Sequence, residues 1–273
     1  MTQKNTGKVW FVGAGPGDPE LLTVKGQGLI ARAGAILFAG SLVSETAMRW
    51  AGEGCEIQDS KGMDLAAITD WLIEKARRND IVVRLQTGDP GLYGALIEMV
   101  QPLDAEGIAV GVVPGVSSAM AAAAAGVESL TLPEVTQTVI LTRVEGRTPM
   151  PGGESLQALA RHHCTLCIFL SITLLKKVQG ELLAAGWPAD APILVVHKAS
   201  WPGEEKIIHG TIGDIREKCQ AEKINSQAMI IASPTIGARQ WPQLKKSRLY
   251  DQAFSHRFRK AKKTPEKKQE TSL

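Results

Sequence analysis

The chain has 273 residues, of which 44% are hydrophobic and 22% are charged, a composition that fits a globular protein with room for two domains. It excludes a chain that is disordered throughout, a collagen and a small disulfide-stapled protein. The net charge is +3, but the charges are distributed unevenly along the chain. Residues 243–273 hold ten basic and three acidic side chains, whereas residues 1–242 hold 21 basic and 25 acidic ones. Nucleic-acid binding generally needs a basic surface on the fold itself, so we expect no nucleic-acid partner.

Short apolar runs alternate with segments of helical spacing. The runs that we expect to form strands are 9–12, 35–39, 81–85, 108–113, 138–141, 166–170, 193–196 and 229–232. Continuous apolar strands between helices are typical of mostly parallel sheets covered on both faces, hence of an α/β protein. One short helix, 211–221, separates a strand at 206–210 from the one at 229–232, which gives the later part more antiparallel character.

We therefore predict two α/β domains, 1–113 and 114–242, with mostly parallel sheets and a cleft between them. The apolar pattern thins after Trp241 and Pro242. Residues 243–273 are interpreted as a basic tail, disordered from about residue 261.

The first predicted strand ends in a glycine-rich loop, Gly13-Ala-Gly15-Pro-Gly17-Asp18. A dinucleotide-binding fingerprint fails here, because its sixth position is Asp18 and no acidic residue closes a second strand about 20 residues later. Asp18 and Pro19 suit the N-cap and first residue of a helix. The loop is either a plain strand-to-helix connection or a site where bare backbone N–H groups meet an anion.

Two later turns repeat this pattern. Thr87-Gly-Asp-Pro90 follows the strand at 81–85, with Asp89 as the expected N-cap of a helix that runs to about Leu103. Pro114-Gly-Val-Ser-Ser118 follows the strand at 108–113 and either opens an ordinary helix or supplies hydroxyl groups at the domain junction. The same proline and glycine divide the uncharged stretch 108–127, which we interpret as a strand, a turn and a helix and not as a membrane span.

Residues 1–8 are polar and show no signal peptide, so we expect a cytoplasmic protein whose cysteines are free thiols. Cys164 and Cys167 form a C-x-x-C pair after two histidines, which raises a zinc or redox site. The sequence has no second pair of this kind, and Cys167 falls within an apolar strand, which favours a place in the core. We expect no protein-bound metal.

Three segments carry a resemblance to a known family: Val12-Gly-Ala-Gly-Pro-Gly-Asp-Pro-Glu-Leu-Leu-Thr23, Thr87-Gly-Asp-Pro90 with Tyr93, and Pro114-Gly-Val-Ser-Ser118. In this order and spacing they resemble the tetrapyrrole methyltransferases that use S-adenosylmethionine. Two more segments, 136–151 and 250–259, look like the branch that methylates C11 of precorrin-4 or cobalt-precorrin-4 in cobalamin biosynthesis. The resemblance implies two unequal α/β domains, a polyanionic tetrapyrrole substrate, S-adenosylmethionine as methyl donor, and a homodimer.

By matching position, the resemblance implies cofactor contacts at Pro16, Gly88, Asp89, Tyr93, Ser117, Ser118, Leu170 and Ala199. S-adenosylmethionine carries a sulfonium cation, so a loop rich in N–H groups suits the carboxylates of the substrate better, and we predict substrate contacts at Gly13, Gly15 and Gly17. Arg143 and Arg147 flank Glu145 in a turn-rich segment that either captures substrate carboxylates or forms an exposed salt-bridged loop. Lys25 and Arg84 are weaker candidates for the same role.

Methyl transfer is an in-line displacement that requires donor and acceptor to be collinear in a site with little water, and it needs no covalent enzyme nucleophile. No catalytic base is assigned; Asp89, Glu145 and water are the candidates. The choice between cobalt-bearing and metal-free substrate stays open, as do methylation of another macrocycle carbon, C20 or C17, and cofactor binding without turnover. The failed fingerprint disfavours a nucleotide-dependent oxidoreductase.

Overall fold

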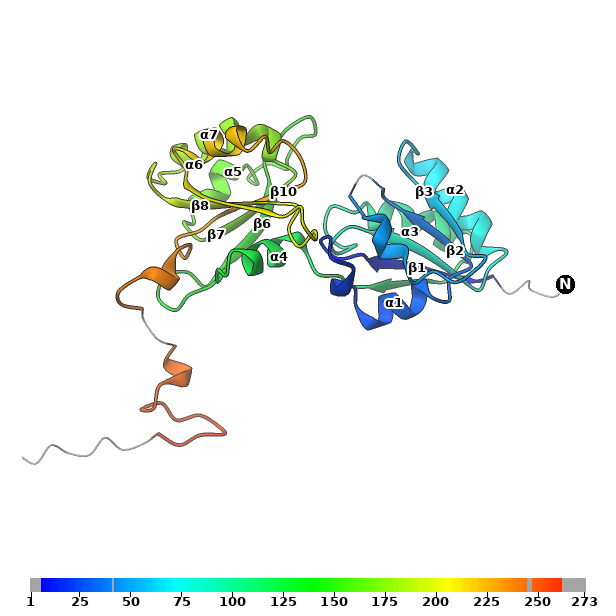
Figure 1. The fold of residues 1–273 in the computed structure, drawn as a ribbon, viewed down its shortest axis with the longest axis horizontal. Coiled ribbons are helices and arrows are strands. Elements are labelled where there is room, and N and C mark those ends of the chain that lie inside the picture. The colour runs from blue at the N-terminus through cyan, green and yellow to red at the C-terminus, as the bar shows by residue number, and fades with distance from the viewer. Residues whose placement is uncertain (1–5, 41, 245–246, 262–273) are drawn as a thin grey trace, which may run out of the picture.

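The structure is a computed structural model that describes residues 6–40, 42–244 and 247–261. It contains two α/β domains, each built around one five-stranded sheet, that lie next to each other (Figure 1). In the first domain the strands are β1 (Lys8–Gly13), β2 (Ala35–Phe38), β3 (Glu56–Asp59), β4 (Ile81–Gln86) and β5 (Val110–Val113). The helices are α1 (Val24–Ile30), α2 (Leu65–Ala76) and α3 (Leu96–Ala105).

All strand pairs of the first sheet are parallel, in the order β3-β2-β4-β1-β5. Its inner strands are apolar on both faces, because helices cover both sides. Leu29 and Ile30 of α1 pack on one face, and Leu72 of α2 and Leu103 of α3 pack on the other. A parallel sheet brings the carboxyl ends of its strands to one edge, where ligands of open α/β folds commonly bind.

The second domain contains β6 (Val139–Arg143), β7 (Thr165–Phe169), β8 (Pro192–His197), β9 (Lys206–Thr211) and β10 (Ala228–Ala232). Its helices are α4 (Ser118–Ala125), α5 (Leu156–Ala160), α6 (Leu175–Ala184) and α7 (Ile215–Ala221). Short 3-10 turns lie at Pro19–Leu21, Glu45–Met48, Ile172–Leu174, Ala238–Gln240 and Arg248–Tyr250.

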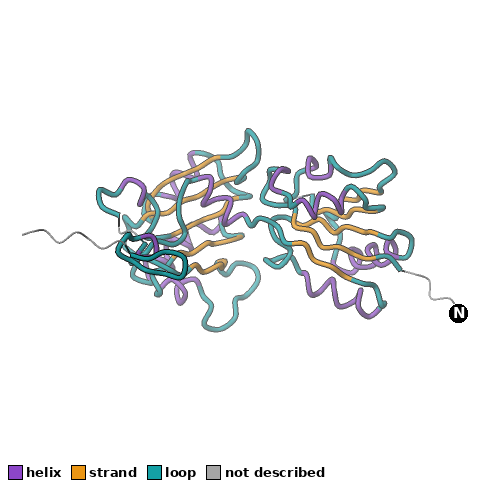
Figure 2. Tube along the Cα trace, turned by 90° about the horizontal axis from the view of Figure 1, so that it is seen from below, coloured by secondary structure: helices purple, strands orange, loops and turns teal. Residues whose placement is uncertain are grey.

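The second sheet has the order β6-β7-β10-β8-β9 and is mixed. β6 and β7 are parallel, whereas β10 runs antiparallel to both β7 and β8, and β9 runs antiparallel to β8. The alanines of α4 pack on one face, against Leu194 and Ile231, while α5, α6 and α7 cover the other face. Figure 1 shows α1 and α4 below the two sheets and the other labelled helices above them, and Figure 2 shows the strands of each sheet side by side.

The predicted fold class is confirmed, with two α/β domains in which parallel pairing predominates and antiparallel strands fall in the later part. Strand β3 was not predicted, because its residues Glu56, Gln58 and Asp59 are polar and it forms an edge of the sheet. β5 ends at Val113, and the next helix, α4, packs on the second sheet. We therefore propose the domain boundary at residues 113 and 114.

Three cysteines, Cys164, Cys167 and Cys219, are buried as free thiols, and Cys55 is partly exposed. Residues 6–40, 42–244 and 247–261 contain no group of three or more histidine, cysteine, aspartate or glutamate side chains placed to hold a metal ion. None of the helices in these ranges has the length and apolar character needed to cross a membrane. The disorder predicted from about residue 261 falls mainly on 262–273, which lie outside the described residues.

Candidate active site

Three glycine-rich turns meet at the carboxyl edge of the first sheet, because they follow the neighbouring parallel strands β1, β4 and β5. The Gly88 N–H donates to the Gly15 carbonyl at 2.8 Å, and the Asp89 carboxylate accepts the Gly115 N–H at 2.9 Å. A Cβ atom built on Gly13 would lie 2.6 Å from the Cα of Gly115, and one built on Gly115 would lie 2.1 Å from the Gly88 oxygen. The turns therefore pack backbone against backbone, and any side chain at Gly13 or Gly115 would force them apart.

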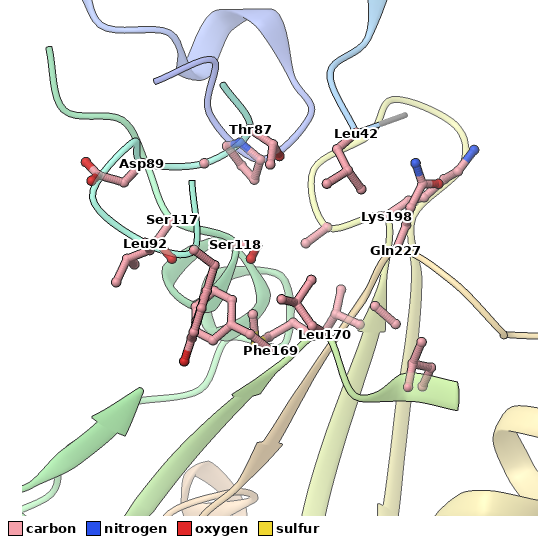
Figure 3. Close-up of a pocket in the computed structure, with 18 of the residues that line it drawn as sticks. Leu42, Thr87, Asp89, Leu92, Ser117, Ser118, Phe169, Leu170, Lys198 and Gln227 are labelled. Atoms are coloured by element: carbon pink, nitrogen blue, oxygen red, sulfur yellow. The ribbon is translucent and has the colours of Figure 1, made fainter. Parts of the chain in front are cut away.

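A pocket lies between these turns and the strand ends of the second sheet (Figure 3). Its first-domain and junction wall consists of Pro16, Leu42, Thr87, Gly88, Asp89, Leu92, Tyr93, Ser117 and Ser118. Its second-domain wall consists of Phe169, Leu170, Ile172, Val196, Lys198, Ala199, Trp201, Gln227, Ala228 and Met229. All of the positions for which the resemblance implied cofactor contacts, from Pro16 to Ala199, line this one pocket.

The pocket wall combines hydroxyl groups with apolar and aromatic side chains. Thr87 and Ser118 bring hydroxyl groups, and Ser117 caps α4 by accepting the Ala119 N–H at 3.3 Å. The Tyr93 ring of the same wall packs on Phe169 of the second-domain wall with 5.3 Å between ring centroids. Burial raises the pKa of Tyr93, which keeps its phenol neutral at physiological pH.

Four side chains of the pocket wall stand on left-handed backbone. The φ angles are 55° at Tyr93, 52° at Leu170, 48° at Lys198 and 46° at Gln227. This conformation is uncommon for residues other than glycine, and such strain concentrates at ligand sites. At Leu170 it ends β7 and leaves the side chain 64% exposed toward the pocket. The strain thus coincides with the surface that a ligand would contact.

A family model described as Tetrapyrrole (Corrin/Porphyrin) Methylases matches residues 8–216. The chain belongs to this family. The family resemblance seen in the glycine turns is therefore confirmed, and the protein is a methylase.

The similarity to named relatives covers almost the whole length of the methylase. It is 45% identical over 257 residues to a cobalt-precorrin-4 C(11)-methyltransferase of Priestia megaterium, covering 94% of this chain and 99% of the relative. It is 43% identical over 251 residues to a precorrin-4 C(11)-methyltransferase of Pseudomonas aeruginosa, covering 92% and 98%. The X-ray structure of a cobalt precorrin-4 methyltransferase, 46% identical, superposes with a TM-score of 0.81 over 84% of this chain and 95% of that one.

A more distant solved structure contains a ligand. Uroporphyrin-III C-methyl transferase from Thermus thermophilus, complexed with S-adenyl homocysteine, is 30% identical to the methylase. It superposes with a TM-score of 0.70 over 85% of this chain and 94% of that chain.

The first glycine turn of the methylase does not offer the expected row of bare N–H groups. The Ala14 N–H donates to the Gln86 carbonyl at 2.7 Å, and the Gly15 N–H donates to the Gly88 carbonyl at 3.4 Å. Gly13 and Gly15 are buried, and neither they nor Gly17 line the pocket. The neighbouring strand β4 and its turn therefore use these two donors. Substrate contacts at Gly13, Gly15 and Gly17 stay a prediction. The predicted cap is confirmed, since Asp18 accepts the Glu20 N–H and Pro19 opens a 3-10 turn.

The second turn also differs from its prediction. Asp89 caps a turn by accepting the Gly91 N–H at 2.8 Å, but α3 begins only at Leu96. The left-handed backbone of Tyr93 and Ala95 postpones the helix, and the Gly94 carbonyl is held by the Gln86 side chain at 2.6 Å. This delay is what leaves Tyr93 free to face the pocket.

The arginine segment forms an exposed loop after β6. The Arg143 guanidinium donates to the carbonyls of Thr148 and Pro149 at 3.2 and 2.7 Å, so it braces its own loop. Glu145 pairs with Lys177 at 3.7 Å and not with either arginine. Arg147 is exposed and makes no hydrogen bond or ion pair within the described residues. Of the two predicted arginines, Arg147 is the one whose guanidinium is available.

Neither candidate base has a carboxylate that faces the pocket freely. Both oxygens of Asp89 accept backbone N–H groups, and its side chain points away from the centre of the pocket in Figure 3. Glu145 lies outside the pocket wall. The weaker substrate candidates lie elsewhere, since Arg84 is buried against Ser60 and Lys25 lies above the Trp10 ring.

Sequence reasoning missed about half of the pocket wall, notably Leu42, Phe169, Lys198, Trp201, Gln227 and Met229. Lys198 precedes the predicted Ala199 and Trp201 follows it by two residues, so the same segment of sequence could have indicated both. Gln227 and Met229 join the wall because β10 pairs antiparallel with β8, with Ala228 opposite His197. That register has no local signal in the sequence.

Proposed function

We propose that this methylase transfers the methyl group of S-adenosylmethionine to C11 of precorrin-4 or cobalt-precorrin-4, a step of cobalamin biosynthesis. One observation supports C11 as the position that is methylated. The chain is 43–46% identical, over more than nine-tenths of its length, to relatives named for C11 methylation. The pocket between the two domains is the proposed cofactor site.

The residues of the pocket fit this cofactor. The apolar residues Leu170, Val196 and Met229 of the second-domain wall suit a flat adenine ring. The hydroxyl groups of Thr87 and Ser118 and the surrounding turns suit the ribose and the amino-acid end. When bound, S-adenosylmethionine supplies a methyl group already activated by its sulfonium charge.

The protein contributes by positioning the methyl donor and the acceptor and by excluding water from the site. The displacement needs donor sulfur, methyl carbon and macrocycle carbon in line, and holding them together accounts for much of the rate gain in reactions of this type. Three turns fixed by the Gly15–Gly88 and Asp89–Gly115 hydrogen bonds supply a rigid floor for that alignment. We propose that Asp89 contributes by holding these turns together and not as a base. Water or the substrate then takes up any proton that is lost.

On the substrate side we propose that Arg147 binds a carboxylate of the macrocycle. Arg147, whose guanidinium is free, follows Arg143, which is held by its own loop. Arg143 lies close enough to Tyr93 of the pocket that its charge offsets part of the effect of burial, which raises the pKa of that phenol. An arginine–carboxylate pair is planar and bidentate, which would orient a substrate with many acetate and propionate groups.

The decisive experiment is incubation with methyl-labelled S-adenosylmethionine and precorrin-4, with and without cobalt, followed by NMR location of the label. We expect label at C11, and the preferred arm identifies the metal state of the substrate. Label at C20 or C17 would place the protein elsewhere in corrin methylation. Cofactor binding without transfer to either substrate would leave a binding protein and overturn the proposal.

We further propose a cytoplasmic homodimer that binds neither nucleic acid nor membranes and needs no protein-bound metal. Sedimentation equilibrium should give twice the mass of 29.3 kDa. Activity should persist after dialysis against a chelator when the metal-free substrate is supplied.

A further inference from the structure

A loop of the second domain, residues 198–205, reaches the first glycine turn. The Trp201 indole N–H donates to the Pro16 carbonyl at 3.0 Å, and the Ser200 hydroxyl accepts the Asp18 N–H at 3.1 Å. These two bonds connect segments more than 180 residues apart in the chain. They join the domains beside the pocket, since Pro16 and Trp201 both belong to its wall.

The contact depends on a glycine. A Cβ atom built on Gly17 would lie 2.1 Å from the Cδ1 atom of Trp201, closer than any real contact allows. The φ of Gly17 is not in the left-handed region. Gly17 is therefore required by the closeness of the indole ring and not by the conformation of its own backbone.

The loop that presents Trp201 is internally braced. The Trp201 N–H donates to the Lys198 carbonyl at 2.9 Å, and the Trp201 carbonyl accepts the N–H groups of Glu204 and Glu205 at 3.1 and 3.2 Å. Lys198 pairs with Glu204 and places its ammonium 4.8 Å from the centre of the Trp201 ring. A rigid loop can transmit the position of the second domain to the turn that it contacts.

We propose that Trp201 is a positioning residue that latches the two domains and sets the width of the cofactor pocket. The inference rests on the proposed function, in that the ligand of this pocket is S-adenosylmethionine or its demethylated product. With the latch formed, Pro16 on one domain and Ala199 on the other hold a fixed separation. Without it, the domains still fold, but the pocket must be closed by the ligand, which lowers its affinity.

The test uses variants on both sides of the contact in the full chain. Trp201→Phe keeps an aromatic ring but removes the N–H donor together with part of the indole, and Gly17→Ala inserts a methyl group against the Trp201 ring. Loss of one neutral hydrogen bond corresponds to roughly a 2- to 10-fold change in binding. We expect the Kd for S-adenosylhomocysteine to rise by about this factor in each variant and KM for S-adenosylmethionine to rise more than kcat falls.

The double variant supplies the specific readout. Because both changes break the same contact, their effects on Kd should be less than multiplicative, whereas independent sites would multiply. Trp241→Phe, outside the pocket wall in the same domain, serves as a control and should leave Kd unchanged.

Unchanged Kd in both single variants, with the unmodified protein still binding S-adenosylhomocysteine, would overturn the latch and leave the proposed function standing. A lower melting temperature with unchanged Kd would likewise assign Trp201 a purely structural role. If the unmodified protein does not bind S-adenosylhomocysteine, both the proposed function and the latch fail.

Discussion

The carboxylate of Asp89 accepts the backbone N–H of Gly115 at 2.9 Å and so ties the turn after β4 to the turn after β5. The other carboxylate oxygen accepts the Gly91 N–H at 2.8 Å. An acidic residue beside a candidate cofactor site is easily taken for a catalytic base. Here its hydrogen bonds indicate a connecting role.

Replacing Asp89 separates these two roles. Asp89→Ala leaves two N–H groups without this partner and should reduce the free energy of unfolding by about 1–3 kcal/mol. It should also weaken S-adenosylhomocysteine binding, measured by calorimetry. Asp89→Asn keeps one acceptor oxygen and should be milder in both respects. A loss of turnover in Asp89→Asn with unchanged binding would instead identify a base.

Replacing Gly88 by valine should abolish cofactor binding in equilibrium dialysis. The φ of Gly88 is +60°, and the nearest atoms to an added Cβ lie at 3.7 Å, so the penalty comes from the backbone and not from a clash. Left-handed backbone costs a β-branched residue roughly 1–2 kcal/mol or more. Gly107 is the matched control, because its φ is +68° and nothing lies within 4 Å. Gly107→Val should lose similar stability and keep cofactor binding; retained binding in Gly88→Val would remove this turn from the site.

Arg147→Ala should weaken tetrapyrrole binding roughly 10- to 100-fold, the range expected for a charged hydrogen-bonded pair, and leave cofactor affinity nearly unchanged. Titration calorimetry with each ligand measures both. Arg161→Ala removes the same charge from another exposed position of the second domain and should change neither affinity. Equal losses for both ligands in Arg147→Ala would contradict a role in substrate binding.

The buried thiols predict a specific alkaline instability. Burial raises the pKa of Cys167 to about 12 and that of Cys219 to about 11, from an ordinary value of 9.0. Because the folded-state pKa values are higher, stability is unaffected below about pH 9 and falls as pH rises from there toward 12. Urea unfolding at pH 8 and pH 10 should show this loss, and Cys167→Ala should reduce it. Rapid reaction of Cys167 with a thiol reagent in the native protein at pH 8 would contradict its burial.

The parts of the fold that could be predicted are those with a local signal. Apolar runs such as the one in β4 marked strands because helices cover both faces of the first sheet. The polar edge strand β3 lacked that signal, since Ile57 is its one apolar residue and is 45% exposed. The late start of α3 was also hidden, because an Asp–Pro pair caps a single turn as readily as a helix.

Site residues that belong to a sequence motif could be predicted. Site residues that depend on contacts between distant segments of the chain could not. Gly88 and Ser117 belong to recognisable turns, and both line the pocket. Trp201 becomes important only through its contact with Pro16, which depends on the arrangement of the two domains. The hydrogen bond from the Gly15 N–H to the Gly88 carbonyl likewise forms only because β1 lies beside β4.

Leu170, Tyr93, Lys198 and Gln227 place large side chains where glycine would fit the backbone with less strain. Glycine at these positions would lower the conformational energy of the native chain and, in the same step, delete the wall against which a ligand packs. A selection for thermal stability alone would therefore favour glycine at these four positions and would remove the side chains that form the pocket wall. Thermal resilience of this protein has to be engineered elsewhere, on surfaces that touch neither the three turns nor the ends of β7, β8 and β10.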